Sequence, residues 1–332
     1  MGRVSETREP RPRRRRRLLR AAVGLFVLLA VAGYFAVQRD SNGGGGAPFC
    51  VASADPVGED GTSESYEMSP EQAANAATIA AVGVAKGLPD RAVTIALATA
   101  MQESALRNLD HGDRDSLGLF QQRPSMGWGT PEQITDPVYS AGIFYDHLVD
   151  VEGYSRLPLT VAAQKVQRSG FPQAYAKHEP DATVLTAAFA GGGTLNCGGP
   201  APAGPGDPER VRADLIRIFG KDGMHTLPPP SGQAGQAGRN SGGGQAAPEV
   251  EVTLVEKKGG GEAVVRRSRA MAHWAVANAK AMGISRVSYD RHGWIGGQDR
   301  GRWQDMGEPG AKNGEGDPYG PRPGEVRIFM AR

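Results

Sequence analysis

One glutamate, Glu103, is the clearest candidate for chemistry in this chain of 332 residues. It comes late in the apolar run "VTIALATAMQES", with Thr99, Ala100 and Leu106 at helical spacings that place them on its own face. Apolar neighbours and the negative end of a helix dipole both raise the pKa of a carboxyl group. A carboxylic acid that stays protonated can donate the proton that a leaving glycosidic oxygen needs. We therefore predict that Glu103 is a general acid; an ordinary surface glutamate in a helix's last turn is the alternative.

The charged loop after Glu103 offers candidates for a second catalytic group. Asp113 or Asp115 could act as the second carboxylate of a hydrolase. Their flanking of Arg114 is more typical of an ion pair that fixes the loop. Gln122 and Arg123 could bind acetamido or peptide carboxylate groups, and Arg123 could equally pair with an aspartate of the same loop.

Other classes of chemistry lack their motifs in this sequence. The six histidines show no HExxH spacing, and neither a GxSxG motif nor a phosphate-binding loop is present. The two cysteines are too few and too far apart for a zinc site. We expect no metal and no cofactor.

The elements that must position Glu103 are predicted to be helices. The segment from Ser69 begins with a serine N-cap, a proline at the first helical position and Gln72 completing a capping box. Helices are expected at 69–87, 88–104, 136–151, 159–169 and 181–190. Strand signals are absent from residues 69–190, so the fold class predicted for this block is mainly α.

Three short motifs in this block resemble a known family. "ES" at Glu103–Ser104, "GLFQ" at Gly118–Gln121 and then "DPVYSAGIFYDHL" occur in the order and spacing of lytic transglycosylases and goose-type lysozymes. The resemblance covers roughly residues 69–190 and implies a lysozyme-like helical catalytic domain. It implies that Glu103 is the catalytic acid, that Ser104 supports it, and that four residues form a wall of the sugar cleft, namely Gly118, Leu119, Phe120 and Gln121.

The sequence departs from the family pattern at two places. Phe120 replaces the family's methionine, and "AAQKVQ" stands where the family has "AYN", so no tyrosine is present there. Gln164 or Gln167 could replace the hydrogen bond of that tyrosine, and Tyr175 could reach the site from "FPQAYA". By resemblance one glutamate serves as acid and then base, and a 1,6-anhydro product forms; the two-carboxylate hydrolysis stays open.

The N-terminal residues predict a membrane anchor. Nine arginines in residues 1–20 precede the uncharged run that begins at Ala21, which is long enough to cross a bilayer as a helix at 21–38. The positive-inside rule then puts the N-terminus in the cytoplasm and the rest of the chain outside. Secretion after cleavage near Ala32 is the alternative. Without the arginine arm the chain is acidic, which argues against nucleic acid as a partner.

Export also predicts a disulfide between Cys50 and Cys197, which bracket the helical block. The predicted organisation is a basic cytoplasmic arm (1–20), an anchor (21–38), a flexible spacer (39–67), the transglycosylase-like domain (68–198), a Pro/Gly-rich linker with one helix (199–247) and a small α+β module (248–332). The strands expected in that module are 249–257, 284–290 and 325–330, and its helix is 262–283.

The function that the resemblance implies is cleavage of the β-1,4 bond between N-acetylmuramic acid and N-acetylglucosamine, with peptidoglycan as the partner. The alternative is a wall-binding or wall-assembly protein that keeps the fold without turnover. An intact Glu103 favours the enzyme.

Overall fold

The computed structural model describes residues 47–54, 64–168, 172–221, 224–227, 249–254, 260–306 and 324–332. The predicted basic arm (1–20), the anchor (21–38) and Ala32 lie outside these ranges, as do parts of the predicted spacer (39–67) and linker (199–247). Within the described ranges, no helix combines the length and the apolar character needed to cross a membrane.

Helices dominate the block in which the sequence predicts them. They are α2 (Pro70–Ala85), α3 (Asp90–Ser104), α4 (Pro131–Ile134), α5 (Pro137–Val149), α6 (Leu159–Gln167) and α7 (Glu179–Ala190), with short 3-10 turns η1 (Pro124–Met126) and η2 (Pro172–His178). The predicted capping box starts α2: the Gln72 N–H donates to Ser69 Oγ at 3.3 Å, and the Ser69 N–H donates to Gln72 Oε1 at 3.0 Å.

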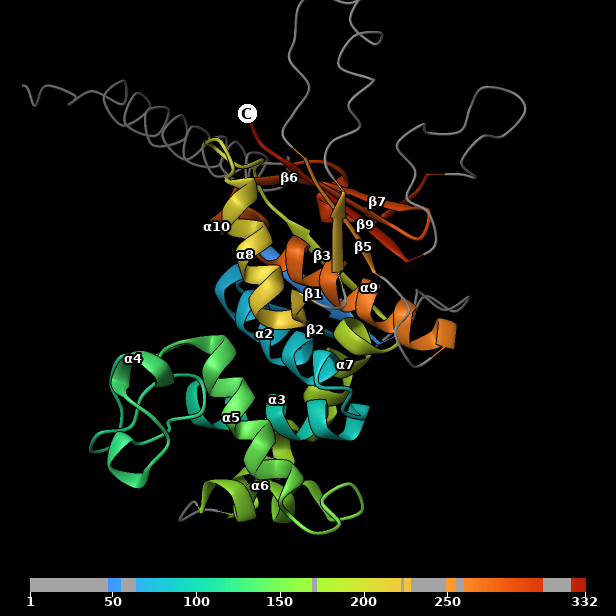
Figure 1. Ribbon diagram of the computed structural model, residues 1–332. Helices are drawn as coiled ribbons and strands as arrows, with labels where there is room; N and C mark the ends of the chain where they lie inside the picture. The colour runs from blue at the N-terminus through green and yellow to red at the C-terminus, as the bar shows by residue number, and fades with distance from the viewer. Residues whose placement is uncertain are drawn as a thin grey trace, which may run out of the picture. The chain divides into compact units, whose positions relative to one another are not determined.

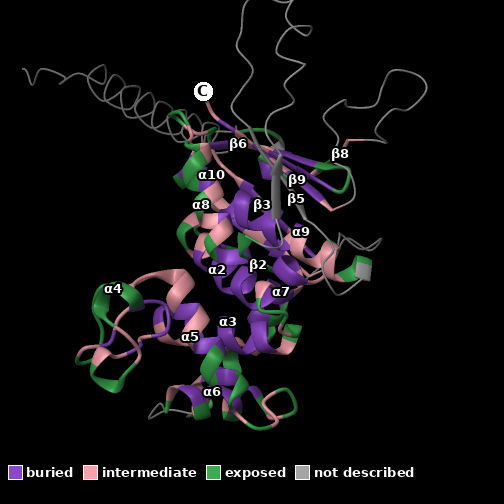
Figure 2. Cartoon of the chain, in the orientation of Figure 1, coloured by how far each residue is buried: buried purple, intermediate pink, exposed green. Residues whose placement is uncertain are grey.

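The central helix of this arrangement is α2, which contacts α3, α5 and α7 (Figure 1). Nearly all of its side chains from Ala73 to Val84 are buried, and alanine is the most frequent residue among them (Figure 2). A helix that is apolar on all sides is stable only inside a core. The small side chains of α2 let the neighbouring helices approach closely. The packing against α2 therefore holds α3, and with it the residues at the C-terminal end of α3, firmly in place.

A small antiparallel sheet joins the two ends of the helical block, where the sequence predicted no strands. Its strands are β1 (Phe49–Ser53), β2 (Ser65–Met68) and β3 (Thr194–Gly198), in the order β2-β1-β3. We expected flexible spacer over β1 and most of β2, and β3 was not predicted. Cys50 and Cys197 lie opposite each other in the β1–β3 register, and the predicted disulfide joins them. β1 and β3 were missed because each pairs with a strand far away in the sequence.

The C-terminal part of the chain forms a second antiparallel sheet with helices on it. Its elements are α8 (Pro208–Phe219), β4 (Met224–Leu227), β5 (Glu249–Leu254), α9 (Gly260–Ala277), α10 (Ala279–Met282), β6 (Ile284–Tyr289), β7 (His292–Ile295), η4 (Asp299–Gly301), β8 (Gln304–Asp305) and β9 (Glu325–Met330), and the strand order is β4-β5-β9-β6-β7-β8. The helix and the three strands expected in this module are present, while β4, β7 and β8 were not predicted. β4 falls in the segment predicted as linker, where it pairs with β5.

The C-terminal elements share a core with the helical block. α9 packs against α2 and α7, and three indole N–H groups reach across this boundary. Trp274 donates to Thr78 Oγ1 at 3.3 Å, Trp294 to the Cys197 carbonyl at 3.3 Å and Trp303 to the Leu195 carbonyl at 2.8 Å. These tryptophans therefore serve packing between the two parts, and residues Pro48–Arg332 form one compact unit.

Fully buried His273, on α9, adds a further link between the two parts. Its Nδ1 donates to the Ala188 carbonyl of α7 at 2.7 Å. Burial lowers the pKa of His273 to about 3, so its imidazole is neutral at physiological pH.

The mainly α composition with additional antiparallel sheets agrees with the predicted fold class.

Candidate active site

Glu103 lies in the last turn of α3, where the helix ends in a tight reversal. Ala105 and Leu106 both adopt positive φ angles, 52° and 60°, which turn the chain sharply away from the helix axis. The Glu103 side chain is half-buried against the apolar helix interior. Burial raises the pKa of Glu103 above its ordinary value because the charged carboxylate loses water. The group is therefore biased toward the protonated form, as its apolar neighbours in the sequence predicted.

Two side chains that the sequence singled out donate hydrogen bonds toward this carboxyl group. The hydroxyl of Tyr175, from η2, donates to Glu103 Oε1 at 2.7 Å, and the tyrosine itself is fully buried. Gln167, at the end of α6, also bonds Glu103, and both bonds lower the pKa of the carboxyl by less than burial raises it. Gln167 Nε2 donates in addition to the Phe120 carbonyl at 2.7 Å. Residues from α3, α6 and η2 thus meet at one carboxyl group.

The "GLFQQ" segment forms a tight loop beside the end of α3. The backbones of Leu117 and Gln122 bond each other in both directions, at 2.9 and 3.0 Å. Ser104 Oγ donates to the Leu119 carbonyl at 2.8 Å, so the residue after the glutamate ties the loop to the helix. The side chains of Leu119 and Phe120 are fully buried in the core behind the site.

Gly118 has a positive φ of 74° and is buried. A Cβ at this position would lie 2.5 Å from the carbonyl oxygen of Ile134. By the resemblance this glycine lines a sugar cleft, where the missing side chain would let a sugar ring approach closely. In the structure the close approach is made by the backbone before α5, so packing of the loop accounts for the glycine.

The two aspartates of the loop have different environments. Asp115 accepts from Arg123 Nε at 2.8 Å and from the Ser125 N–H at 2.9 Å, and these bonds hold the pKa of its carboxyl well below the usual range. The Asp113 side chain is exposed, and its backbone carbonyl accepts from Ser116. Of the two alternatives for Arg123, the geometry gives the pair with an aspartate of its own loop, which fixes the loop's shape.

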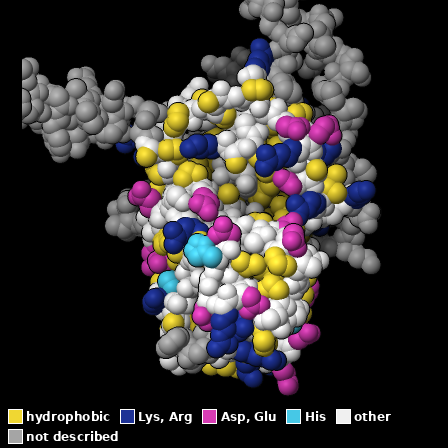
Figure 3. All heavy atoms as spheres, turned by 90° about the vertical axis from the view of Figure 1, so that its left-hand side faces the viewer, with side chains coloured by type: hydrophobic (Ala, Val, Ile, Leu, Met, Phe, Trp, Pro, Cys, Tyr) yellow, Lys and Arg dark blue, Asp and Glu magenta, His cyan; other side chains and the backbone are white. Residues whose placement is uncertain are grey.

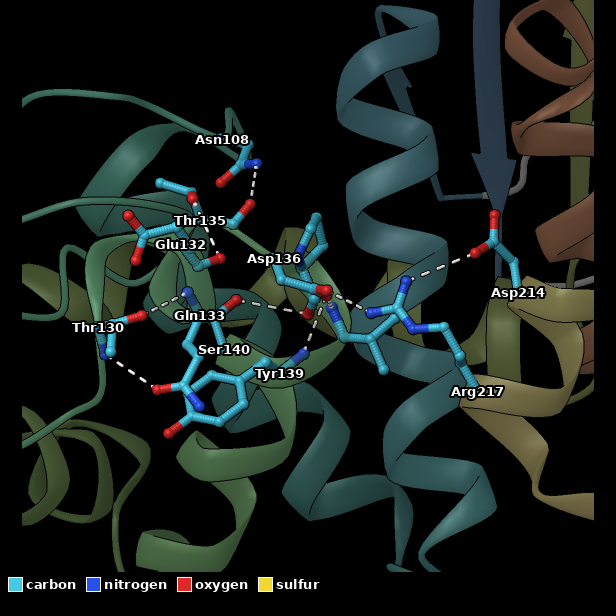
Figure 4. Close-up of polar contacts among 12 residues, drawn as sticks. Asn108, Thr130, Glu132, Gln133, Thr135, Asp136, Tyr139, Ser140, Asp214 and Arg217 are labelled. Atoms are coloured by element: carbon cyan, nitrogen blue, oxygen red, sulfur yellow. Dashed lines mark hydrogen bonds and ion pairs between the residues drawn. The ribbon is translucent and has the colours of Figure 1, made fainter. Parts of the chain in front are cut away.

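The far end of the loop is anchored to neighbouring helices (Figure 4). Asn108 Nδ2 donates to the Thr135 carbonyl at 2.7 Å, which joins the loop's start to its end. Asp136 caps α5 by accepting from the Val138 N–H at 2.9 Å, and its other oxygen pairs with Arg217 of α8. These contacts hold the loop from both sides of the site.

The other predicted binding residues lie along the same loop and α6. Gln121 is half-buried and bonds within the loop, donating to the Gly118 carbonyl at 3.3 Å. Gln122 is buried and donates to the Ser140 carbonyl of α5 at 3.1 Å. Gln164 lies half-buried on α6, one turn before Gln167. A cavity of about 250 Å³ lies beside the site, and Gln121, Gln122 and Gln167 are among its lining residues.

Two polar residues of α2 support the site and were not predicted. Gln72 Nε2 donates to the Ala105 carbonyl at 2.9 Å, and Asn75 Nδ2 donates to the Leu106 carbonyl at 2.8 Å. They satisfy the backbone where α3 ends in its unusual reversal. An asparagine on an otherwise apolar, alanine-rich helix is the signal that could have identified Asn75.

The arrangement can perform proton transfer with a single carboxyl group. Glu103 is half-buried, biased toward the protonated form and oriented by Tyr175 and Gln167, whereas the carboxylate of Asp115 is occupied by an ion pair. No protein-family model matches this sequence, and no curated protein matches it either.

Proposed function

We propose that this protein is a lytic transglycosylase-type enzyme of peptidoglycan, with Glu103 as its general acid and base. The observation that carries the proposal is the half-buried carboxyl at the end of α3, held by Tyr175 and facing a loop that resembles a sugar-cleft wall. On this proposal the helical block is a lysozyme-like fold. The bond that breaks is the β-1,4 link between N-acetylmuramic acid and N-acetylglucosamine.

The proposed reaction uses the one carboxyl group twice. Protonated Glu103 donates its proton to the glycosidic oxygen as the bond to the anomeric carbon breaks. The resulting carboxylate then takes the proton of the muramic acid 6-hydroxyl while that oxygen bonds to the anomeric carbon. Glu103 is thereby restored to its protonated form, and the product carries a 1,6-anhydro ring.

The environments of the loop aspartates favour this route over hydrolysis with two carboxylates. A nucleophilic or basic carboxylate must be free to approach the sugar from the face opposite the leaving oxygen, or to activate a water there. Asp115 instead holds Arg123 and the Ser125 N–H. The Asp113 side chain is exposed to solvent, as is typical of a surface residue.

The tyrosine missing from the family's position is replaced, on this proposal, by Tyr175. Its hydroxyl reaches the Glu103 carboxyl from η2 and not from α6.

We further propose that the enzyme acts on the outer side of the membrane, anchored by residues 21–38 with the basic arm in the cytoplasm. Peptidoglycan is the proposed partner, and no cofactor takes part.

The deciding experiment replaces Glu103 by glutamine in the full-length protein. Glu103→Gln keeps the shape of the side chain but cannot donate the proton, so we expect turnover of peptidoglycan to fall by about 10²–10⁴-fold while binding persists. Mass spectrometry of the released muropeptides measures both the rate and the product ends. Glu152→Gln, an exposed glutamate, is the matched control and should retain activity.

The aspartate variants then separate the mechanisms. With one carboxyl, Asp113→Asn retains much of the parent's activity and the products carry 1,6-anhydro ends. Reducing ends, together with an aspartate variant that is folded yet as inactive as Glu103→Gln, would establish a two-carboxylate hydrolase instead. Cleavage by Glu103→Gln at the parent's rate would rule out the site, and a wall-binding protein would take its place.

A further inference from the structure

The cavity beside Glu103 has a one-sided charge. It lies between the loop 121–128 and the C-terminal end of α6, and it has a volume of about 250 Å³. Its charged lining residues are Arg123, Lys165 and Arg168, and none of the described aspartates or glutamates lines it. His147 also lines the cavity. A cavity lined in this way selects anionic ligands.

Two of these cations are available to a ligand. Arg123 is neutralised by Asp115, but among the described residues neither Lys165 nor Arg168 takes part in an ion pair, and both are exposed. Figure 3 shows Lys and Arg side chains gathered low on the face that it draws, at the height of α6 in Figure 1. Two unpaired cations on one rim can bind one or two carboxylates.

The lining also contains an unused hydrogen-bond acceptor. Gln122 is only 2% exposed, and its Oε1 is buried without a hydrogen-bond partner in the described structure. Its amide nitrogen is already used, donating to the Ser140 carbonyl. A buried, unsatisfied acceptor costs free energy unless a ligand or water meets it. An amide N–H of a peptide is a donor of the right kind.

Apolar surface completes the lining. Met126, on η1, is 58% exposed, and Trp128 packs its ring against His147 at 4.5 Å between ring centroids. Gln167 lines the cavity and also bonds Glu103, so this one side chain connects the cavity to the acid. The ligand groups that this lining suits are carboxylates, amide groups and short aliphatic side chains, and a peptide carries all three.

We propose that this cavity binds the short, carboxylate-bearing peptide attached to muramic acid next to the bond that is cut. Lys165 and Arg168 recognise its carboxylates, and Gln122 accepts one of its amide protons. The proposal rests on the function proposed above, and it adds that the enzyme selects glycan strands that still carry their peptides.

A structural role for the two cations must be separated from this binding role. Both lie at the C-terminal end of α6, where a positive charge also stabilises the helix. Lys165→Arg with Arg168→Lys keeps the charge at the helix end and at the cavity. Lys165→Gln with Arg168→Gln removes both. The control Arg156→Gln with Arg302→Gln removes two exposed cations that do not line the cavity.

The test measures equilibrium binding and cleavage by the full-length protein on two soluble substrates. One is a glycan strand with its peptides, and the other is the same strand after an amidase has removed them; both are freed of phosphate-containing wall polymers. We expect the parent and the control to bind the peptide-bearing strand more tightly. The glutamine double variant should lose roughly 3- to 30-fold in affinity for that strand alone, through KM and not kcat, and the charge-keeping variant should restore it.

Equal binding of the two strands by the parent protein would overturn the proposal, as would a glutamine double variant that behaves like the control. Tighter binding of a free glycerol-phosphate polymer than of the peptide-bearing strand would overturn the assignment of carboxylates. Because binding is measured separately from turnover, the peptide preference is tested even if the protein proves unable to cleave either strand.

Discussion

At the scale of single residues, the pKa of Glu103 is set by two opposing influences. Burial at the end of α3 raises it, and the hydrogen bonds from Tyr175 and Gln167 lower it by a smaller amount. The net effect keeps the carboxyl protonated to higher pH than an exposed glutamate. The tyrosine also fixes which way the carboxyl faces, because its own ring is held in the core.

Tyr175→Phe tests this balance through the pH dependence of catalysis. The hydroxyl stabilises the ionised carboxylate, so its removal raises the pKa of Glu103 further. A general acid works while protonated, and the alkaline limb of the pH–rate profile should therefore move to higher pH. Tyr145→Phe is the control, since that hydroxyl donates to the Ile79 carbonyl at 3.0 Å. An unmoved limb in Tyr175→Phe would show that the tyrosine does not tune the acid.

At the scale of elements, the loop between α3 and α5 is held as a rigid piece. Ser104 and Gln167 bond the carbonyls of Leu119 and Phe120, and the backbone of Ile134 fills the space beside Gly118. The loop is thus packed against α3, α6 and the start of α5 at the same time. Its shape fixes the distance between the acid and the residues that line the cavity.

Gly118→Ala should destabilise the protein by two mechanisms at once. A left-handed conformation costs a residue with a Cβ about 1–2 kcal/mol, and the clash with the Ile134 carbonyl adds roughly 1–3 kcal/mol of overpacking. Gly127→Ala separates the two, since Gly127 has a φ of 84° and open space around its Cβ position. Urea unfolding should show the larger loss for Gly118→Ala. Equal losses in the two variants would mean that the close approach to Ile134 contributes nothing.

At the scale of the whole molecule, the disulfide and the tryptophans join both parts of the chain. The Cys50–Cys197 bridge closes a loop of 147 residues, and the carbonyl of Cys197 accepts from Trp294. β3 therefore carries both the disulfide that closes the helical block and a carbonyl that bonds to the C-terminal sheet. The separate module predicted from the sequence shares this strand and the α2–α9 contact with the helical block.

Cys50→Ser with Cys197→Ser should lower the stability of residues 48–332 as one unit. Chain-entropy arguments give up to about 4–5 kcal/mol for a loop of this length. Helical circular dichroism and tryptophan fluorescence should report the same, lowered unfolding temperature, because three of the four tryptophans bridge the two parts. Chemical reduction of the parent protein is the control and should reproduce the shift. Two separate transitions would instead indicate that the C-terminal part unfolds independently.

The sequence alone determined the features that depend on local chemistry. The capping box at Ser69, the helix periodicities and the proline-started α5 could be predicted because neighbouring residues decide them. The placement of Glu103 among apolar neighbours followed from helical spacing. The Cys50–Cys197 pairing followed from the inferred export of the chain and from the number of cysteines.

Only the tertiary structure decided the features that depend on distant residues. β1 fell in the predicted spacer and β3 was not predicted, because each strand of five residues is stabilised by a partner that lies about 147 residues away. The sequence proposed Gln164, Gln167 and Tyr175 as candidates beside the acid. The packing of η2 and α6 against α3 decided that Tyr175 and Gln167 reach the carboxyl group. The packing of α9 on α2 could not be predicted from the sequence either, because an alanine-rich helix face does not reveal which partner covers it.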